Sequence, residues 1–196
     1  MRMSTGWIQW SLGSCIAFAI CIQWANGNEA RDREPVKSMV SAVSEPEEIT
    51  RAIKGTGAKI VFVSAWSSSC PFCLEEMPAI AAAYKELKDT VGVSFVGISL
   101  DGLTLRGKIS EEAKSRALSA TRTTVERKGL SFTNLVWCGA ADPIVEKFGI
   151  ETTPFNAVYS GEGKLLAELP QLPEDSIDAA RVIKRSILEE FDKQKK

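Results

Sequence analysis

The sequence KIVFVSAWSSSCPFCLEEMPAI, residues 59–80, joins an apolar segment to a helical one through two cysteines. Residues 59–66 are almost continuously apolar, which is typical of a strand buried on both faces of a parallel sheet. From Pro71 onward, apolar side chains recur at helical spacing, and proline is favoured at the first position of a helix. A second apolar segment at 93–100 completes a β–α–β unit with an expected right-handed crossover. The sequence therefore predicts an α/β fold with cysteines where a buried strand meets a helix.

The position of Cys70 at the predicted start of the helix indicates a reactive thiol. Unpaired N–H groups and the positive end of the helix stabilise a thiolate, which is the attacking species in disulfide exchange. Cys73 follows one turn later, close enough to pair with Cys70. The spacing therefore predicts a redox-active dithiol. A static structural disulfide and half of a zinc site are the alternatives.

Composition narrows the chemistry that the chain has available. The sequence contains no histidine, which excludes a Ser-His-Asp triad, a Cys-His dyad and any His-ligated metal site. Lys and Arg number 24 against 25 Asp and Glu, so we expect no nucleic-acid partner. Outside the apolar N-terminus, only Cys138 accompanies the CxxC pair, and it is expected to be a buried bystander at the end of a strand. We therefore expect no metal and no cofactor.

The N-terminal 28 residues have the pattern of an export signal or a membrane anchor. A positive N-terminus precedes an apolar stretch, and residues 25–27 are the small residues that a signal peptidase needs. The apolar stretch is also about long enough to span a membrane. The polar segment 29–45 is expected to be a linker, and residues 46–196 the folded domain. We therefore expect the protein outside the cytoplasm, where disulfides persist.

The rest of the sequence predicts further elements of the same domain. The polar segment 103–129 is expected to be an insertion that is helical from Ser110 onward. A closing amphipathic helix is expected at 174–191, with Ile177 and Leu188 among its inward-facing residues. The other expected elements are helices at 46–54 and 142–148, and strands at 133–138, 155–160 and 164–169, the last two joined as a hairpin.

Two motifs carry a resemblance to a known family. One is WSSSCPFCLEEMP at 66–78; the other is FGIETTP at 148–154, followed by the Gly-containing hairpin. Together they resemble the TlpA/ResA-like thiol–disulfide oxidoreductases, a branch of the thioredoxin superfamily, over about residues 59–169. The resemblance implies a thioredoxin-like α/β fold, with a central mixed sheet flanked by helices.

The resemblance also implies a function. Such proteins exchange disulfides with protein substrates outside the cytoplasm, often as reductants, for example in cytochrome c maturation, and draw electrons from a membrane thiol carrier. Carried over by position, Cys70 is the nucleophile, Cys73 resolves the mixed disulfide, and Glu76 is the acidic residue near the thiols. The residues expected to contact the substrate are Trp66, Thr153 and Pro154, with Pro154 as the family's cis proline.

Two other functions stay open. A thioredoxin-fold binding module would keep its disulfide static. A peroxiredoxin-like peroxidase has a cysteine at the same junction, with proline at position 64 and Thr or Ser at position 67. Ser67 fits this pattern and Ser64 does not, while the second cysteine three residues on favours exchange.

The chain departs from the family pattern at several places. Ser69 stands where Trp usually precedes the first cysteine, Thr152 replaces a usual Gly, and residues 170–173 replace a loop that often contains Gly. The insertion is also longer than usual. Phe72 occupies the position where strongly oxidising relatives carry His, which stabilises the thiolate. We therefore expect a pair that is more reducing than theirs.

Overall fold

Apolar strands buried on both faces form the centre of the molecule. The computed structural model describes residues 39–105 and 107–194. The strands are β1 (Val40–Val43), β2 (Ile60–Trp66), β3 (Val93–Ser99), β4 (Thr133–Trp137), β5 (Phe155–Ser160) and β6 (Leu165–Glu168). They form one six-stranded sheet in the order β1-β4-β3-β2-β5-β6. β1 to β4 are parallel to one another. β5 runs antiparallel to its neighbours β2 and β6, which makes the sheet mixed as predicted.

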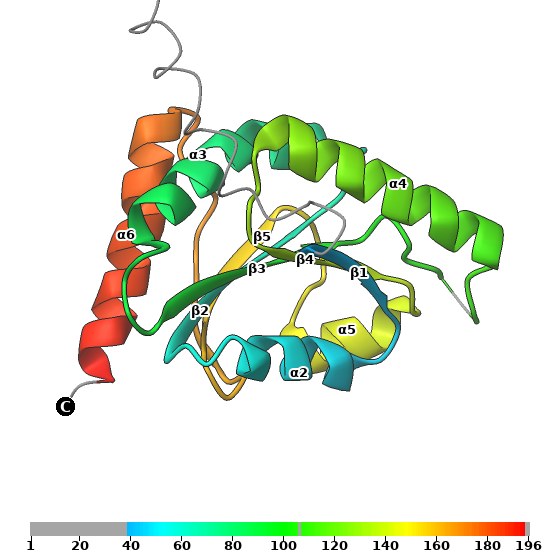
Figure 1. The fold of residues 1–196 in the computed structure, drawn as a ribbon, viewed down its shortest axis with the longest axis horizontal. Coiled ribbons are helices and arrows are strands. Elements are labelled where there is room, and N and C mark those ends of the chain that lie inside the picture. Colours follow the sequence, from blue (N-terminus) through cyan, green and yellow to red (C-terminus); the bar gives the residue numbers. More distant parts are fainter. Residues whose placement is uncertain (1–38, 106, 195–196) are drawn as a thin grey trace, which may run out of the picture. The chain divides into compact units, whose positions relative to one another are not determined.

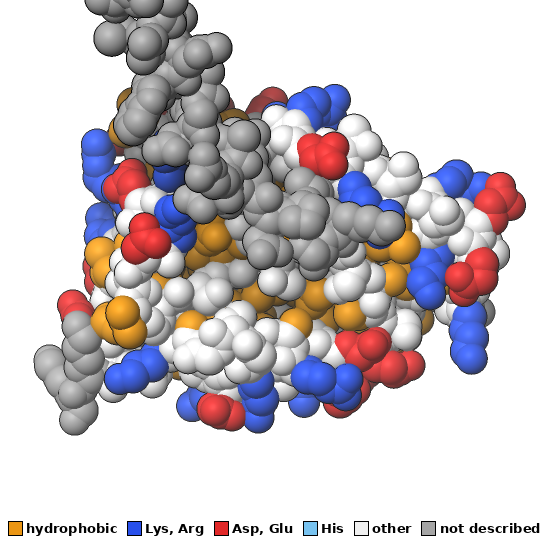
Figure 2. Space-filling model, viewed as in Figure 1, with side chains coloured by type: hydrophobic (Ala, Val, Ile, Leu, Met, Phe, Trp, Pro, Cys, Tyr) orange, Lys and Arg blue, Asp and Glu red, His pale blue; other side chains and the backbone are white. Residues whose placement is uncertain are grey.

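Helices cover both faces of this sheet (Figure 1). On one face lie α3 (Pro71–Leu87), α4 (Glu111–Lys128) and α6 (Ser176–Lys193), and on the other α2 (Pro46–Gly55) and α5 (Ala141–Phe148). Hydrophobic side chains gather between the two helix layers, and charged ones lie at the rim (Figure 2). This double cover explains why β2 is almost continuously apolar in sequence. None of the helices in the described part of the chain is long and apolar enough to cross a bilayer.

The order of these elements is that of a thioredoxin-like fold. β2, α3 and β3 form the predicted β–α–β unit, and the β5–β6 hairpin and α6 close the domain. α4 lies in the predicted insertion and begins after Ser110, whose hydroxyl accepts a hydrogen bond from the backbone N–H of Ala113. The fold class predicted from the sequence is confirmed.

The sheet begins earlier in the chain than the sequence pattern indicates. Segment 29–45 is predicted to be a linker, but its residues Val40–Val43 form the edge strand β1 beside β4. Val40 and Val43 are buried while Ser41 is exposed, and a strand of four residues leaves too short an alternation to recognise. The predicted export signal or anchor at 1–28 lies outside the described residues.

The buried face of α6 is narrower than predicted. Ile177 is 69% exposed and Leu188 is also exposed, which contradicts the inward positions expected for both. The buried residues of α6 are Ala179, Ala180, Ile183 and Ile187, and partly buried Val182 and Phe191 also pack against the core. On a helix with 3.6 residues per turn, Ile177 and Leu188 lie to one side of these buried residues. The prediction was wrong for both because it rested on their hydrophobic character alone.

Candidate active site

The two cysteines of the CxxC motif form a disulfide at the N-terminus of α3. Cys70 is the N-cap residue, and its Sγ accepts a hydrogen bond from the backbone N–H of Cys73 at 3.2 Å. The Cα atoms of the pair lie 5.3 Å apart. Cys70 is partly exposed whereas Cys73 is only 2% exposed. An approaching substrate sulfur therefore reaches Cys70 first.

Local sequence explains why the pair sits at a helix end. Pro71 occupies the first turn of α3, where its missing N–H is not needed by the helix. The side chain of Phe72 is 64% exposed and lies between the two cysteines in sequence. No charged side chain belongs to the first turn, so the helix end itself is the nearest positive group on α3.

Glu76 lies one turn beyond Cys73 on the same face of α3. It is half-buried, whereas Glu75 is exposed. Nδ2 of Asn156, a buried residue of β5, donates a hydrogen bond to Oε2 of Glu76 at 2.8 Å. Burial raises the pKa of Glu76, and the hydrogen bonds from the Asn156 side chain and the Leu172 backbone oppose that rise. The site therefore holds a carboxyl group whose pKa lies above its ordinary range.

The three residues predicted to contact a substrate have different environments. The Thr153–Pro154 peptide bond is cis, and both residues are partly exposed. Because Phe155 pairs with Ala65, the cis bond lies beside the end of β2, where the chain turns toward Cys70. The side chain of Trp66 is only 2% exposed and packs in the core, away from any surface that a protein substrate would touch.

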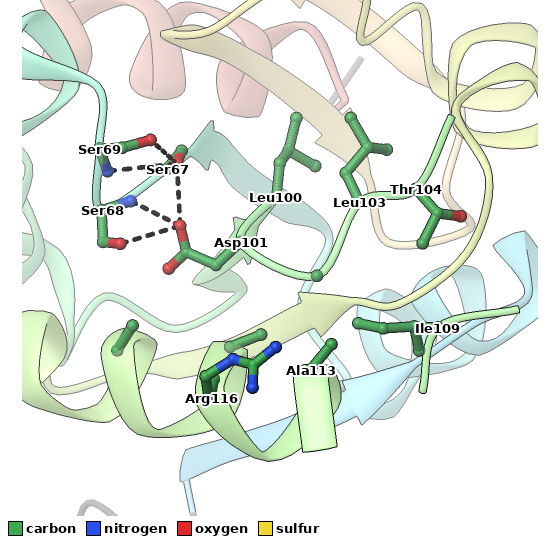
Figure 3. A pocket seen from close by; sticks show the side chains of 13 residues that line it. Ser67, Ser68, Ser69, Leu100, Asp101, Leu103, Thr104, Ile109, Ala113 and Arg116 are labelled. Carbon is green, nitrogen blue, oxygen red and sulfur yellow. Dashed lines mark hydrogen bonds between the residues drawn. The ribbon is translucent and has the colours of Figure 1, made fainter. Parts of the chain in front are cut away.

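The loop that leads into Cys70 is held by a carboxylate that lies outside the two sequence motifs. Asp101 lies just after β3, and its Oδ1 accepts hydrogen bonds from Ser67 Oγ at 2.8 Å and from Ser68 N and Oγ at 2.8 and 3.0 Å (Figure 3). Its Oδ2 lies 3.2 Å from Thr121 Oγ1 of α4. The sequence does contain a signal for this role of Asp101. Asp101 follows an apolar strand, and the carboxyl end of that strand lies at the same sheet edge as the cysteines.

Comparison with known proteins assigns the family. The model described as the AhpC/TSA family matches residues 42–165, more than half of the chain, including the cysteine pair. The chain belongs to the AhpC/TSA family. Together with the Cys70–Cys73 disulfide, membership of the AhpC/TSA family confirms the predicted enzyme class, a thioredoxin-like thiol–disulfide oxidoreductase. No curated protein matches the chain.

Several solved structures are similar to this AhpC/TSA-family chain. The thioredoxin domain of a thiol-disulfide oxidoreductase from Bacteroides vulgatus is 21% identical with a TM-score of 0.48, over 72% of this chain and 82% of that one. A secreted disulfide oxidoreductase from Mycobacterium tuberculosis is 20% identical with a TM-score of 0.45, over 65% and 81%. A thiol:disulfide interchange protein from Chlorobium tepidum is 19% identical with a TM-score of 0.47, over 70% and 84%.

The third cysteine near the domain core of this AhpC/TSA protein is a free thiol. Cys138 directly follows β4, is 5% exposed and forms no disulfide. Burial raises the pKa of its thiol, which disfavours the reactive thiolate. These features agree with the expected bystander role, which remains a prediction. Within 39–105 and 107–194, no three Cys, Asp or Glu side chains are grouped as metal ligands.

Proposed function

We propose that this chain reduces disulfides in protein substrates through the Cys70–Cys73 pair. The observation that carries the proposal is the unequal exposure of the two sulfurs at a helix N-terminus. A partly exposed Cys70 suits attack on another protein, and a buried Cys73 suits resolution within the chain. The family and the disulfide support this chemistry.

The reaction balances without a cofactor. In the reduced protein, the Cys70 thiolate attacks one sulfur of the substrate disulfide, whose S–S bond breaks and releases a substrate thiolate. The Cys73 thiol then loses its proton and attacks Cys70 Sγ, which releases the second substrate sulfur and forms the Cys70–Cys73 disulfide. Two electrons pass from the dithiol to the substrate. Glu76, with its raised pKa, is the proposed acceptor of the Cys73 proton.

We infer the direction of transfer from Phe72, the second of the two residues between the cysteines. Phe72 brings no charge that would stabilise the Cys70 thiolate beyond the helix end. Strong oxidants with very acidic thiols have potentials near about −120 mV, and thioredoxin lies near about −270 mV. We expect a value closer to thioredoxin's, measured by titrating the pair against dithiothreitol. A potential above roughly −150 mV contradicts the reducing role.

The resemblance of residues 66–78 and 148–154 to TlpA/ResA-like proteins supports a more specific role. In that role the chain is exported by its N-terminal segment or anchored by it. It then receives electrons from a membrane thiol carrier and reduces substrates such as those of cytochrome c maturation.

Insulin reduction by the full chain tests the exchange chemistry. Cys70→Ser should abolish turnover, and Cys73→Ser should accumulate mixed disulfides because the resolving thiol is missing. A Cys70→Ser variant with undiminished turnover contradicts the proposal. A wild-type chain that never reduces insulin is a binding module with a static disulfide. One that consumes hydrogen peroxide much faster than disulfides is a peroxidase.

A further inference from the structure

A groove runs between the loop that leads into Cys70 and the insertion helix α4 (Figure 3). Its first section has a volume of about 510 Å³ and is lined by residues 67–69 and 100–104 on one side and by α4 on the other. A second section of about 460 Å³ continues along α4 and shares Ser68, Arg116 and Ala120 with the first. The groove therefore passes alongside the residues that immediately precede the predicted nucleophile.

The wall opposite α4 is rigidly organised. Asp101 contributes the only acidic side chain among the residues lining either section. Its Oδ1 already accepts three hydrogen bonds from Ser67 and Ser68, and its Oδ2 faces Thr121. Asp101 is therefore occupied in holding the loop. Because these hydrogen bonds already hold the loop before a ligand binds, binding costs little further conformational entropy on this side of the groove.

The wall formed by α4 carries positive charge. Arg116 and Arg127 line the second section together with four hydroxyl-bearing residues and no carboxylate. Arg127 forms no ion pair within the described residues, and Figure 3 shows the Arg116 side chain extending from α4 among the residues that line the groove. Arg116 also pairs with Glu112 one turn away, but both side chains are largely exposed. Such surface pairs contribute only about 0.3–0.5 kcal/mol, so a second carboxylate competes readily for Arg116.

The first section has a different character. Apolar side chains of this section come from Ile109, Ala113 and Ala117 on the α4 side and from exposed Leu103 in the loop after β3. Hydroxyl groups of the loop wall line the same section, and Arg116 borders both sections, so the groove offers apolar and polar contacts at one end and two arginines toward the other. Such a surface fits an extended polypeptide that carries an apolar and an acidic part.

We propose that this groove binds the segment of a substrate protein that flanks its reacting cysteine, with acidic side chains of that segment paired to Arg116 and Arg127. The proposal rests on the proposed function. Ser69 lines the groove and directly precedes Cys70, so a chain joined to Cys70 as a mixed disulfide lies at its entrance. In the sheet, β3 and β5 lie on opposite sides of β2, the strand that leads to Cys70. The groove lies on the β3 side, and Pro154 lies on the β5 side. The insertion thereby selects substrates on the side of the cysteine pair that faces away from Pro154.

Two matched peptides test this proposal on the full, reduced chain. Each carries one cysteine in a mixed disulfide with neutral 2-mercaptoethanol; one has Asp and Glu beside the cysteine, and the other Asn and Gln at the same positions. The measurement is the ratio of their second-order rate constants in single turnover. The same ratio is measured with dithiothreitol as the reductant in place of the protein. Dividing the first ratio by the second corrects for the intrinsic reactivity of the two peptides. We expect a corrected preference of about fivefold for the acidic peptide at low salt.

The variants assign the preference to the groove. In Arg116→Gln/Arg127→Gln the corrected ratio should fall to about one, and salt near about 0.5 M should have the same effect on the wild type. Arg181→Gln, which removes an exposed arginine of α6 outside the groove, should keep the full preference. A wild-type ratio of about one, or a preference that survives in the double variant, overturns the proposal. If neither peptide reacts at all, the proposed function fails instead.

Discussion

At the scale of single residues, Asn156 is the side-chain hydrogen-bond partner of the half-buried Glu76. Its Nδ2 donates to the Glu76 carboxylate, while its buried Oδ1 has no hydrogen-bond partner among the described residues. A primary amide offers both a donor and an acceptor, so after rotation Asn156 would accept from a protonated Glu76. The amide therefore provides a hydrogen-bond partner for both protonation states of the carboxyl group.

Replacing Glu76 by Gln tests its predicted proton transfer. Burial raises the pKa of Glu76, so the carboxyl is protonated at low pH and accepts the Cys73 proton only above that raised pKa. In the wild type, resolution of the mixed disulfide should therefore accelerate as pH rises through this pKa. Glu76→Gln should lack this rise and be about tenfold slower above it, because the Cys73 thiol must then lose its proton without help from a neighbouring carboxylate.

The measurement is stopped-flow resolution of a preformed mixed disulfide between roughly pH 5 and 9. Glu75→Gln is the matched control, because Glu75 is exposed on the same helix and should leave the profile unchanged. Identical profiles for the wild type and Glu76→Gln remove Glu76 from the mechanism.

The site was predictable from the sequence wherever neighbouring residues define it. Cys70, Cys73 and Glu76 share one helix, and their spacing places them on or near one face. Asn156 is 80 residues away from Glu76 in sequence and meets it only because β5 pairs with β2. Trp66 shows the converse case: the family resemblance implied a contact with the substrate, but Trp66 is the last residue of a strand buried on both faces and its side chain lies in the core.

At the scale of elements, the insertion helix supports the active-site helix at a defined point. Pro78 lies inside α3 and lacks the N–H that would bond to the carbonyl oxygen of Leu74 four residues earlier. Lys128 Nζ, at the end of α4, donates to that oxygen at 2.9 Å. The hydrogen bond lost within α3 is thus replaced from α4, at the residue that directly follows Cys73.

Lys128→Met should therefore destabilise the domain. The variant keeps the length and apolar stem of the side chain but leaves the partly buried Leu74 carbonyl without a donor, which costs about 1–2 kcal/mol. Urea unfolding of the oxidised chain measures the loss. Lys85→Met, at an exposed position of α3, should change the unfolding free energy by less than about 0.5 kcal/mol. Equal effects of the two variants would show that Lys128 gives no specific support.

The helices and strands themselves were largely predictable. The spacing of hydrophobic residues and the residues that cap a helix are both visible within a short stretch of sequence. Pro78 in the sequence even marks an unpaired carbonyl within α3. The sequence does not reveal its partner, since Lys128 is 54 residues away and reaches Leu74 only through the packing of α4. Ile177 and Leu188 were misplaced because an apolar residue at a helix surface has the same local pattern as one in the core.

At the scale of the whole molecule, β1 completes the sheet beside β4. Each of its residues pairs with β4, from Val40 opposite Asn134 to Val43 opposite Trp137. The backbone N–H of Cys138 also donates to the carbonyl oxygen of Val43 at 2.7 Å. Without β1, this edge of β4 would present unpaired backbone groups to solvent, which promotes association with other chains.

Two N-terminal truncations test whether the domain begins at β1. A chain starting at residue 39 keeps β1 and should match the full chain in unfolding free energy and in exchange rate. A chain starting at residue 46, the boundary predicted from the sequence, loses the buried side chains of Val40 and Val43. Burial of two valines contributes about 2–4 kcal/mol, so this chain should unfold at lower urea concentration and associate at high protein concentration. Equal stability of the two truncated chains would place β1 outside the cooperative domain, and the linker would then extend to residue 45 as predicted.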